Sequence, residues 1–296
     1  AVARLRQRKC REEKPFAVMV RNIETARTIV EANLHEEGLL ASPQRPIVLL
    51  IKKSNSVLSD GIAPDMGRLG VMLAYTPVQH LLLERHFTAL VMTSANRNDE
   101  PICTGNRDAV QRLQGIADFF LVHNRDILVR CDDSIAMVAA GRPRLMRRAR
   151  GFVPRPIMLA REHQAVLALG PHLKSTVCII KNNQAFLSPH IGDMETPQAR
   201  DFFHENISLL KKITDCSPAI VACDLHPGYY SSAFAGAMKN NRVVKIQHHH
   251  AHIASCMAEN RLTGKVIGLA MDGTGYGTDG TIWGGEFLIA NEAEFV

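Results

Sequence analysis

The chain has 296 residues, 46% of them hydrophobic and 22% charged, a globular composition with apolar mass for one large or two medium cores, and two domains are favoured. Its 35 Lys and Arg exceed its 29 Asp and Glu, giving a net charge of +6 that suits an anionic partner such as a nucleotide, an acyl phosphate or RNA. The cysteines form no CxxC pair and no run has the length of a membrane span, which argues against a disulfide framework, a zinc finger or a membrane protein and predicts a soluble protein of the reducing cytoplasm.

Residues 1–154 are predicted to form an α/β domain. After a basic, helix-like start, helical segments alternate with short apolar strands, which is the pattern of that fold class. The predicted helices cover residues 24–36, 78–87 and 109–120, and the predicted strands cover 16–20, 46–51, 89–94 and 119–124. Five arginines between Arg142 and Arg150 and two prolines follow, and because proline breaks regular structure we predict a linker at residues 155–163.

Residues 164–296 are predicted to form a second domain. Three strand-like runs come first, at 165–170, 176–181 and 184–193. Predicted helices at 199–214, 230–239 and 251–260 then alternate with strands at 219–224, 243–247 and 266–275. This order describes one half of a mixed-sheet nucleotide-binding fold. The chain lacks an initiator Met and stops in strand-like sequence, so we expect it to be a fragment of a longer protein.

The most specific local signal is QHHHAHIASC at residues 247–256. His248 and His252 stand four apart there, at a junction from strand to helix. On a helix this spacing places both imidazoles on one face, one turn apart, where they can chelate a divalent ion such as zinc or iron. The alternative is a polar helix N-terminus with solvated histidines.

A glycine-rich segment follows twenty residues after His252. An apolar strand is predicted to end at Asp272, and Gly273, Gly275 and Gly277 come next. Such glycines let backbone N–H groups approach phosphate oxygens, and a carboxylate at the end of a strand can ligate a cation. A plain hairpin would look alike, but its combination with metal-type histidines is less often coincidental.

A second turn of small residues follows the first strand of this domain. It contains Gly170, Lys174, Ser175 and Thr176, and its backbone and single lysine are suited to meeting a phosphate. A simple hairpin turn explains these residues equally well.

The start of the chain is strongly basic, with Arg6, Arg8, Lys9, Arg11 and Lys14 before Pro15. Such a run is most often a solvated face. At the end of the strand 89–94, however, Thr93, Ser94 and Asn96 offer hydroxyl and amide groups to a phosphate or carboxylate. A Ser-Ala-Asn turn without such company would be uninformative.

In their order along the chain, the motifs resemble those of HypF-type carbamoyltransferases, which act in the maturation of nickel-iron hydrogenases. In the second domain the resemblance is carried by LGPHLKSTVCII, LSPHIGDM, DLHPGYYSS, HHHAH, DGTGYG and WGGEF. These motifs are also similar, more remotely, to those of the universal tRNA threonylcarbamoyl transferases. In the first domain RQRKCREEKPFAVM is similar to the K-x-R-x-x-K-P segment of YrdC-type domains, and HNRDILVRCDDSI and LMRRARGFVP fit the HypF pattern.

The resemblance implies an α/β fold with two domains. Residues 1–154 would form a YrdC-like domain with a mixed, twisted sheet, truncated at its N-terminus, and residues 164–296 the first part of a Kae-like carbamoyltransferase domain, an α/β half-domain of the ASKHA type (actin/Hsp70-like ATPases). Complete HypF proteins also carry an acylphosphatase domain and Cys-rich zinc fingers. The fragment alone is therefore not expected to carbamoylate a partner from carbamoyl phosphate.

The resemblance also implies the roles of particular residues. His248, His252 and Asp272 would hold a divalent metal, zinc or iron, that anchors nucleotide phosphates, whereas His249 and His250 would have no ligand role. ATP and the carbamoyl-adenylate would contact first-domain residues, namely Lys9, Arg11, Lys14, Ser94, Asn96, Ser134, Arg148 and Arg150. Phosphate in the second domain would contact Lys174, Ser175, Gly273, Gly275 and Gly277.

The implied reaction begins with carbamate, released from carbamoyl phosphate elsewhere in the full protein. The first domain would join carbamate to ATP with Mg²⁺, and the second would pass the carbamoyl group to the C-terminal cysteine of a HypE-type partner, on the way to the cyanide ligand of the hydrogenase iron. The alternative is a YrdC-related tRNA-modification or RNA-binding module. Against nucleic acid, only 5% of residues are aromatic, whereas readers of single-stranded RNA rely on base stacking.

Overall fold

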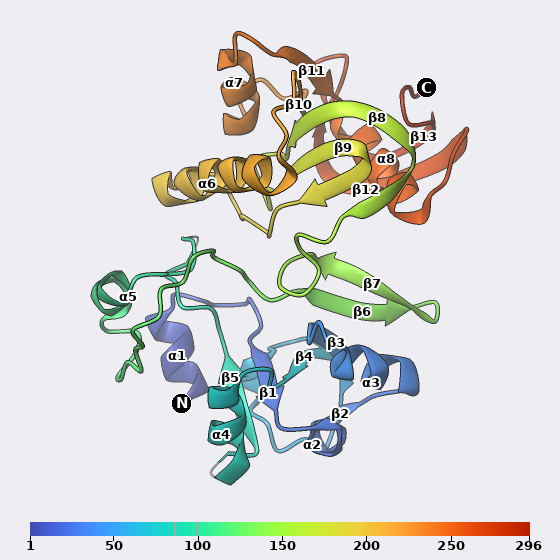
Figure 1. Cartoon of the computed structure of the whole chain (residues 1–296). Coiled ribbons are helices and arrows are strands. Elements are labelled where there is room, and N and C mark those ends of the chain that lie inside the picture. Colours follow the sequence, from blue (N-terminus) through green and yellow to red (C-terminus); the bar gives the residue numbers. More distant parts are fainter. Residues whose placement is uncertain (86, 99) are drawn as a thin grey trace. The chain divides into compact units, whose positions relative to one another are not determined.

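The structure is a computed structural model that describes residues 1–85, 87–98 and 100–296 (Figure 1). The chain divides into two compact units, Ala1–Phe152 and Val153–Val296, close to the predicted end of the first domain at residue 154. The predicted linker at 155–163 differs from the structure, because most of it belongs to strand β8 (Ile157–Leu169). Ile157 and Met158 already pair with strand β9, so the prolines lie just before the strand. Among the described residues, no helix has both the length and the apolar character needed to cross a membrane.

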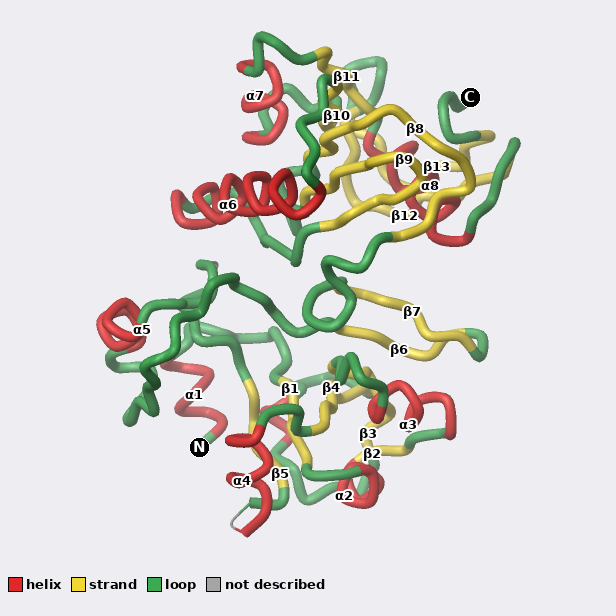
Figure 2. The backbone as a smooth tube through the Cα atoms, viewed as in Figure 1, coloured by secondary structure: helices red, strands yellow, loops and turns green. Residues whose placement is uncertain are grey.

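The first unit is built on a seven-stranded mixed sheet in the order β5-β1-β4-β3-β6-β7, with β2 paired to β3 (Figure 2). Its strands are β1 (Ala17–Val20), β2 (Val30–Glu31), β3 (Ile47–Lys52), β4 (Arg68–Leu73), β5 (Ala89–Met92), β6 (Ile135–Ala139) and β7 (Arg142–Arg147). Its helices are α1 (Val2–Arg8), α2 (Ile23–Ile29), α3 (Leu34–Ala41), the 3-10 turn η1 (Asp60–Ile62), α4 (Pro77–Arg85) and α5 (Asn106–Leu113). Alternate residues of the central strands, such as Val18, Val48 and Val71, are fully buried in its main core, as the period of two in a strand requires.

Three predicted elements of this unit differ from the structure, one of them the helix predicted at 109–120, which is α5 and ends at Leu113. The helix predicted at 24–36 is two helices, because Val30 and Glu31 pair with β3 and Asn33 then starts α3 with a capping box. The strand predicted at 119–124 does not form. Phe119 is 93% exposed and Leu121 is 83% exposed, so an apolar run without a neighbouring strand stays irregular there.

The second unit contains a four-stranded sheet in the order β11-β10-β8-β9. Strands β8, β10 (Ile220–Asp224) and β11 (Arg242–Ile246) are parallel, and β9 (Val177–Leu187) is antiparallel to β8. The strands predicted at 176–181 and 184–193 are thus one strand that ends at Leu187. The helices are α6 (Pro197–Thr214), α7 (Tyr230–Ala237) and α8 (His248–Asn260). Phe203 of α6 is fully buried in the same core cluster as Ile179 and Val221.

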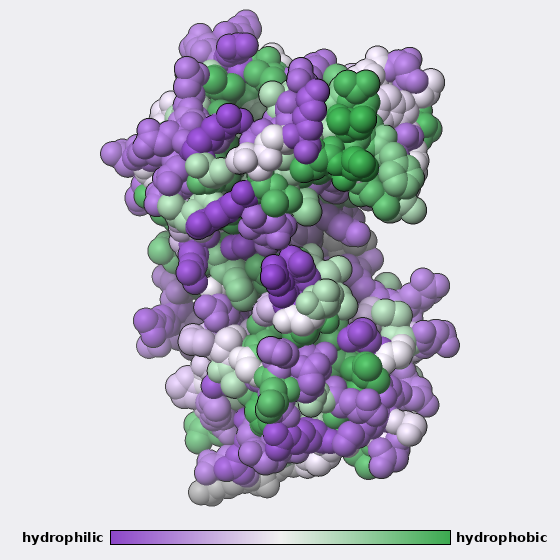
Figure 3. Space-filling model, turned by 90° about the vertical axis from the view of Figure 1, so that its right-hand side faces the viewer, coloured by the Kyte–Doolittle hydropathy of each residue, from purple (hydrophilic) through white to green (hydrophobic). Residues whose placement is uncertain are grey.

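A hairpin of β12 (Val266–Tyr276) and β13 (Ile282–Ala290) completes this unit. One face of the hairpin packs on α8, where Leu288 and Ala290 meet Ile253 and Met257. Residues on the other face are apolar and largely exposed, namely Ile267, Leu269, Met271, Phe287 and Ile289. Hydrophobic surface is visible on this unit in the space-filling view (Figure 3). The hairpin therefore carries Asp272 on a strand that α8 supports from one side.

Candidate functional site

The site in the second unit begins at the N-terminus of α8. The helix starts at His248 directly after β11, and the side chain of Gln247 caps it by accepting from the backbone N–H of His250 at 2.8 Å. The rings of His248 and His252 lie one turn apart, with their Nε2 atoms 3.2 Å from each other. The cap therefore fixes the first turn, which presents both imidazoles on one face.

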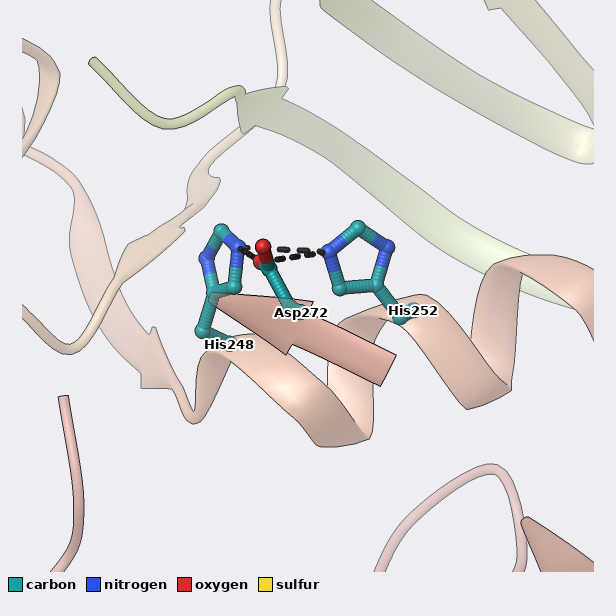
Figure 4. A group of neighbouring side chains, drawn as sticks. All are labelled: His248, His252 and Asp272. Carbon is teal, nitrogen blue, oxygen red and sulfur yellow. Dashed lines mark hydrogen bonds and ion pairs between the residues drawn. The ribbon is translucent and has the colours of Figure 1, made fainter. Parts of the chain in front are cut away.

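Asp272 reaches the same point from β12. Its Oδ2 lies 3.0 Å from Nε2 of His248 and 3.3 Å from Nε2 of His252, and Figure 4 shows all three groups pointing at one another. Ligand atoms bound about 2.0–2.2 Å from one ion are separated by roughly 3.0–3.5 Å. The predicted convergence of these side chains is confirmed, and their donor atoms and spacing fit one divalent metal.

Two acids, Asp224 and Asp272, set the charge around this triad, and a cation would bind in competition with a proton on His248. The hydrogen bond to Asp224 raises the pKa of His248, although partial burial of the ring opposes it. Burial also acts to raise the pKa of Asp272, but the Gly273 amide and the nearby imidazoles outweigh it and lower the pKa overall. Asp272 is therefore an ionised carboxylate at neutral pH, as a metal ligand must be.

The other two histidines of the run lie elsewhere. His249 is fully buried, and burial lowers the pKa of its ring, which keeps it neutral. Nε2 of His250 lies 2.8 Å from the backbone oxygen of Asn291. Neither ring joins the triad, so His249 and His250 are packing residues of α8.

The glycines after Asp272 lie within the hairpin, because β12 continues to Tyr276 with a register shift between Met271 and Gly275. A Cβ atom on Gly275 would lie 2.6 Å from Nε2 of His249, and one on Gly277 would lie 2.3 Å from Nε1 of Trp283. Gly273 has open space at that position. Packing therefore accounts for Gly275 and Gly277 without a phosphate, and all three stay predictions as phosphate contacts.

Substitution Gly275→Ala is expected to lower the free energy of unfolding by about 1–3 kcal/mol, because the new methyl group meets the buried His249 ring, which has no room to move. Chemical denaturation of the purified chain measures the loss. Gly273→Ala is the matched control, since a Cβ there meets nothing within 4 Å. Equal unfolding free energies for the two variants would contradict this account of the packing.

The turn with Lys174 and Ser175 is held by backbone contacts. The backbone N–H of Lys174 donates to Oδ1 of Asp193 at 2.7 Å, while the lysine side chain is exposed. The Ser175 hydroxyl is fully buried and has no hydrogen-bond partner among the described residues. Of these two residues, only Lys174 has a side chain exposed to solvent, where it could meet an anion. Both residues remain predictions as phosphate contacts.

Sequence reasoning missed a chain of side chains that links this turn to the triad. The rings of His172 and Tyr229 stack with centroids 5.7 Å apart, and those of Tyr229 and His226 stack at 4.2 Å. The backbone N–H of His226 then donates to Asp224, which contacts His248. The DLHPGYY motif was the available signal, but its spacing along the chain reveals no contact with the histidine run.

A second polar cluster lies in the first unit. The ammonium of Lys9 donates to the Ser94 backbone oxygen at 2.8 Å and to Oγ1 of Thr93 and Oδ1 of Asn96 at 3.2 Å each. Arg11 donates to the same threonine hydroxyl at 3.3 Å. The structure thus brings together Lys9, Arg11, Ser94 and Asn96 from two distant segments of this unit's sequence, as predicted. The concave pocket expected around them stays a prediction.

This cluster places positively charged side chains in a largely buried position. Lys9 is only 5% exposed, and burial, followed by the nearby Arg11, lowers its pKa to about 8. Burial, followed by Arg6 and Arg147, also lowers the pKa of Arg11. Asp132 is the acid whose charge acts on Arg11 and opposes this lowering. Two cations held this close suit an anion, and the nucleotide contacts stay a prediction. Arg147, which was not among the predicted contacts, also belongs to these surroundings.

The remaining predicted contacts have structural partners. The Ser134 hydroxyl is buried and donates to the backbone oxygen of Arg150. Arg150 bonds to Asp133 and to the backbone oxygens of residues 44 and 45, and its guanidinium lies over the Tyr75 ring. Arg148 donates to the backbone oxygen of Phe152, and Lys14 is exposed. These four stay predictions. Of them, Lys14 adjoins the Lys9 cluster, because its backbone oxygen accepts from Arg11 at 2.9 Å and its charge helps to lower the pKa of Lys9.

Family models match both units. A model described as "Telomere recombination" (Sua5, YciO and YrdC) matches residues 1–149. The HypF Kae1-like domain matches residues 161–259, and the second subdomain of the carbamoyltransferase Kae1-like domain matches 268–296. The matched regions follow the two units of the structure.

Curated relatives match nearly the whole chain. Carbamoyltransferase HypF of Rhizobium leguminosarum bv. viciae is 49% identical over 98% of this chain and 39% of that protein. The Synechocystis protein of the same name is 48% identical over 97% and 38%, and a probable carbamoyltransferase HypF of Methanocaldococcus jannaschii is 35% identical over 99% and 39%. The chain thus spans about two fifths of the length of these relatives.

Solved structures show the same similarity. Full-length HypF in its phosphate- and nucleotide-bound form superposes with a TM-score of 0.96 at 48% identity, covering 100% of this chain and 47% of that one. HypF of T. kodakarensis gives a TM-score of 0.93 at 41% identity, covering 97% and 38%. The predicted combination of a YrdC-like and a Kae1-like fold is confirmed.

Proposed function

Since the chain belongs to the HypF family of carbamoyltransferases, we propose that it supplies the carbamoyl-activating and carbamoyl-transferring parts of hydrogenase maturation. Carbamate and ATP would give carbamoyl-adenylate and pyrophosphate in the first unit. The second unit would pass the carbamoyl group to the C-terminal cysteine thiol of a HypE-type partner and release AMP. The resulting thiocarbamate would be the source of the cyanide ligand of the hydrogenase iron.

The first unit suits adenylation because that step brings two anions together. Carbamate must approach the α-phosphate of ATP while negative charge develops on the departing pyrophosphate, and fixed cations offset both. Lys9 and Arg11 provide such charge beside the hydroxyl and amide groups of Thr93, Ser94 and Asn96. Mg²⁺ would accompany the nucleotide through its phosphate oxygens. The similar full-length HypF was solved in a phosphate- and nucleotide-bound form, which agrees with nucleotide chemistry in this family.

The second unit suits the anchoring of a phosphate through a metal. His248, His252 and Asp272 would hold zinc or iron, which when bound supplies a positive charge for phosphate oxygens. The chain's own groups orient the site: Gln247 caps α8, and β12 places the carboxylate. The convergence of these three side chains from two elements is the single observation that carries the proposal.

A pyrophosphate-exchange assay tests the division of labour. The chain with ATP, Mg²⁺ and carbamate is expected to exchange labelled pyrophosphate into ATP only when carbamate is present. Arg11→Ala should reduce exchange at least about 10-fold, because a charge-assisted contact is worth about 1.5–3 kcal/mol. Asp272→Asn in the other unit serves as the comparison and should leave exchange intact. Exchange that is absent, or that responds to Asp272 and not to Arg11, would refute the assignment of adenylation to the first unit.

A further inference from the structure

Asp224, the last residue of β10, contacts the candidate metal centre through Nδ1 of His248. It is a carboxylate with a side chain only 5% exposed, and both of its oxygens have partners. Oδ1 accepts from the backbone N–H of His226 at 2.8 Å, and Oδ2 lies 2.6 Å from Nδ1 of His248. The position follows from the sheet, in which β10 and β11 run parallel and end side by side before α8 begins.

With a metal in the triad, this arrangement leaves Nε2 of His248 to the metal and the ring proton on Nδ1. Without a metal, Asp272 faces Nε2 as Asp224 faces Nδ1, so the two carboxylates compete for ring protons. An ionised carboxylate only accepts hydrogen bonds, so the contact to Asp224 requires a proton on Nδ1. A neutral ring protonated at Nδ1 has its lone pair on Nε2. Nε2 is the atom that faces Asp272 and His252, and a metal ligand needs that lone pair.

We propose that Asp224 is a positioning residue that holds His248 in its metal-binding tautomer and orientation. The inference rests on the proposed metal site and adds a residue that touches neither metal nor substrate. Asp224 also ties the centre to residues 225–229 through the His226 amide. A shift of that loop would therefore reach His248 through one shared carboxylate.

Asparagine at position 224 distinguishes positioning from simple packing. Its side chain has nearly the same shape but only one accepting oxygen, whereas Asp224 accepts at both. The backbone N–H of His226 can only donate, so it would bond to the single accepting oxygen of the asparagine. The amide NH₂ group then faces Nδ1 of His248 and favours the tautomer protonated at Nε2, which has no lone pair for a metal.

The test compares the tautomer of His248 and Zn²⁺ affinity in three variants. Long-range ¹H–¹⁵N spectra of the histidine-labelled chain with Zn²⁺ should show His248 with its proton on Nδ1 and Nε2 bound to the metal in wild type, and a smaller fraction of this form in Asp224→Asn at the same Zn²⁺ concentration. Zn²⁺ affinity should fall by about 10- to 100-fold in that variant. Asp224→Ala frees the ring without imposing the wrong tautomer, so it should lose less affinity although it costs more stability. Asp201→Asn, on the exposed side of α6, is the control for the charge change.

The outcomes separate this inference from the metal site itself. Wild-type chain that binds no Zn²⁺ would refute the metal site. Wild-type binding with an unchanged tautomer and affinity in Asp224→Asn would refute the positioning role alone, as would a larger affinity loss in Asp224→Ala. In a His248→Ala background, Asp224→Asn should have no further effect on affinity, because positioning acts only through that ring. A full additive loss of Zn²⁺ affinity in that background would assign Asp224 a different role. The same comparison shows whether the loss in Asp224→Asn comes from reduced stability, because a stability effect would also appear without His248.

Discussion

His252→Ala is expected to lower Zn²⁺ affinity by more than about 100-fold, with little change in stability. Loss of a partner outside the ligand set costs a metal site about 10- to 100-fold, and His252 would be a ligand, with Nε2 3.2 Å from that of His248 and 3.3 Å from Oδ2 of Asp272. Its side chain is 55% exposed, so little packing is lost with the ring. Competition with a chromogenic chelator measures the affinity, and thermal denaturation measures the stability.

His163→Ala is the matched control for this substitution. His163 lies in β8 and is exposed, so the substitution removes an imidazole without affecting the triad. Retention of wild-type Zn²⁺ affinity by His252→Ala would show that α8 and β12 do not share a metal. Equal loss in both variants would point to non-specific binding by surface histidines.

Lys9→Met is expected to reduce ATP binding by the chain by about 100-fold. The ammonium is the common donor to three oxygens of residues 93–96, and methionine removes both the charge and the donors while keeping the length. Loss of these internal charge-assisted bonds, each worth about 1.5–3 kcal/mol, would release residues 93–96 from their positions, and a phosphate would lose the field of a nearby cation as well. Titration calorimetry with ATP and Mg²⁺ measures the affinity. Arg21→Met, at an exposed position of the same unit, removes one positive charge as the control, and an equal loss there would contradict a local role for Lys9.

The same lysine sets a pH dependence with opposite signs for binding and stability. Because burial lowers its pKa to about 8, ATP affinity should fall as the pH rises through about 8, and this step should be missing in Lys9→Met. The unfolded chain keeps the proton up to the ordinary lysine pKa of 10.5. Between about pH 8 and 10.5 the unfolded state therefore binds more protons, and the contribution of Lys9 to the free energy of unfolding rises with pH. An affinity that stays level from pH 7 to 9 would refute the depressed pKa.

The convergence of the triad was predictable because most of its information is local. His248 and His252 need only a helix to share a face, and Asp272 stood out as an acid between an apolar strand and glycines. Asp224 was not predictable in this way. It lies 24 residues before His248, and only the parallel pairing of β10 with β11 brings the two together.

The errors in the fold have a common cause, since apolar character alone does not identify the partner of a segment. Residues 119–124 have the composition of a strand but pair with none, whereas the short Val30–Glu31 segment pairs with β3 inside a predicted helix. The glycines of β12 show the same limit for function. Their spacing suggested a phosphate, but the space beside Gly275 and Gly277 is taken by His249 and Trp283.

The run of histidines at the start of α8 sets the rotational phase of the helix. Each residue advances a helix by about 100°, so the packing of His249 against Gly275 and the contact of His250 with Asn291 determine where His248 and His252 point. A deletion or insertion of one residue between Gln247 and His252 would keep the histidine count nearly unchanged and still turn the chelating pair away from Asp272. The four imidazoles are therefore not interchangeable. His249 and His250 fix the orientation of the helix, and that orientation determines where His248 and His252 point.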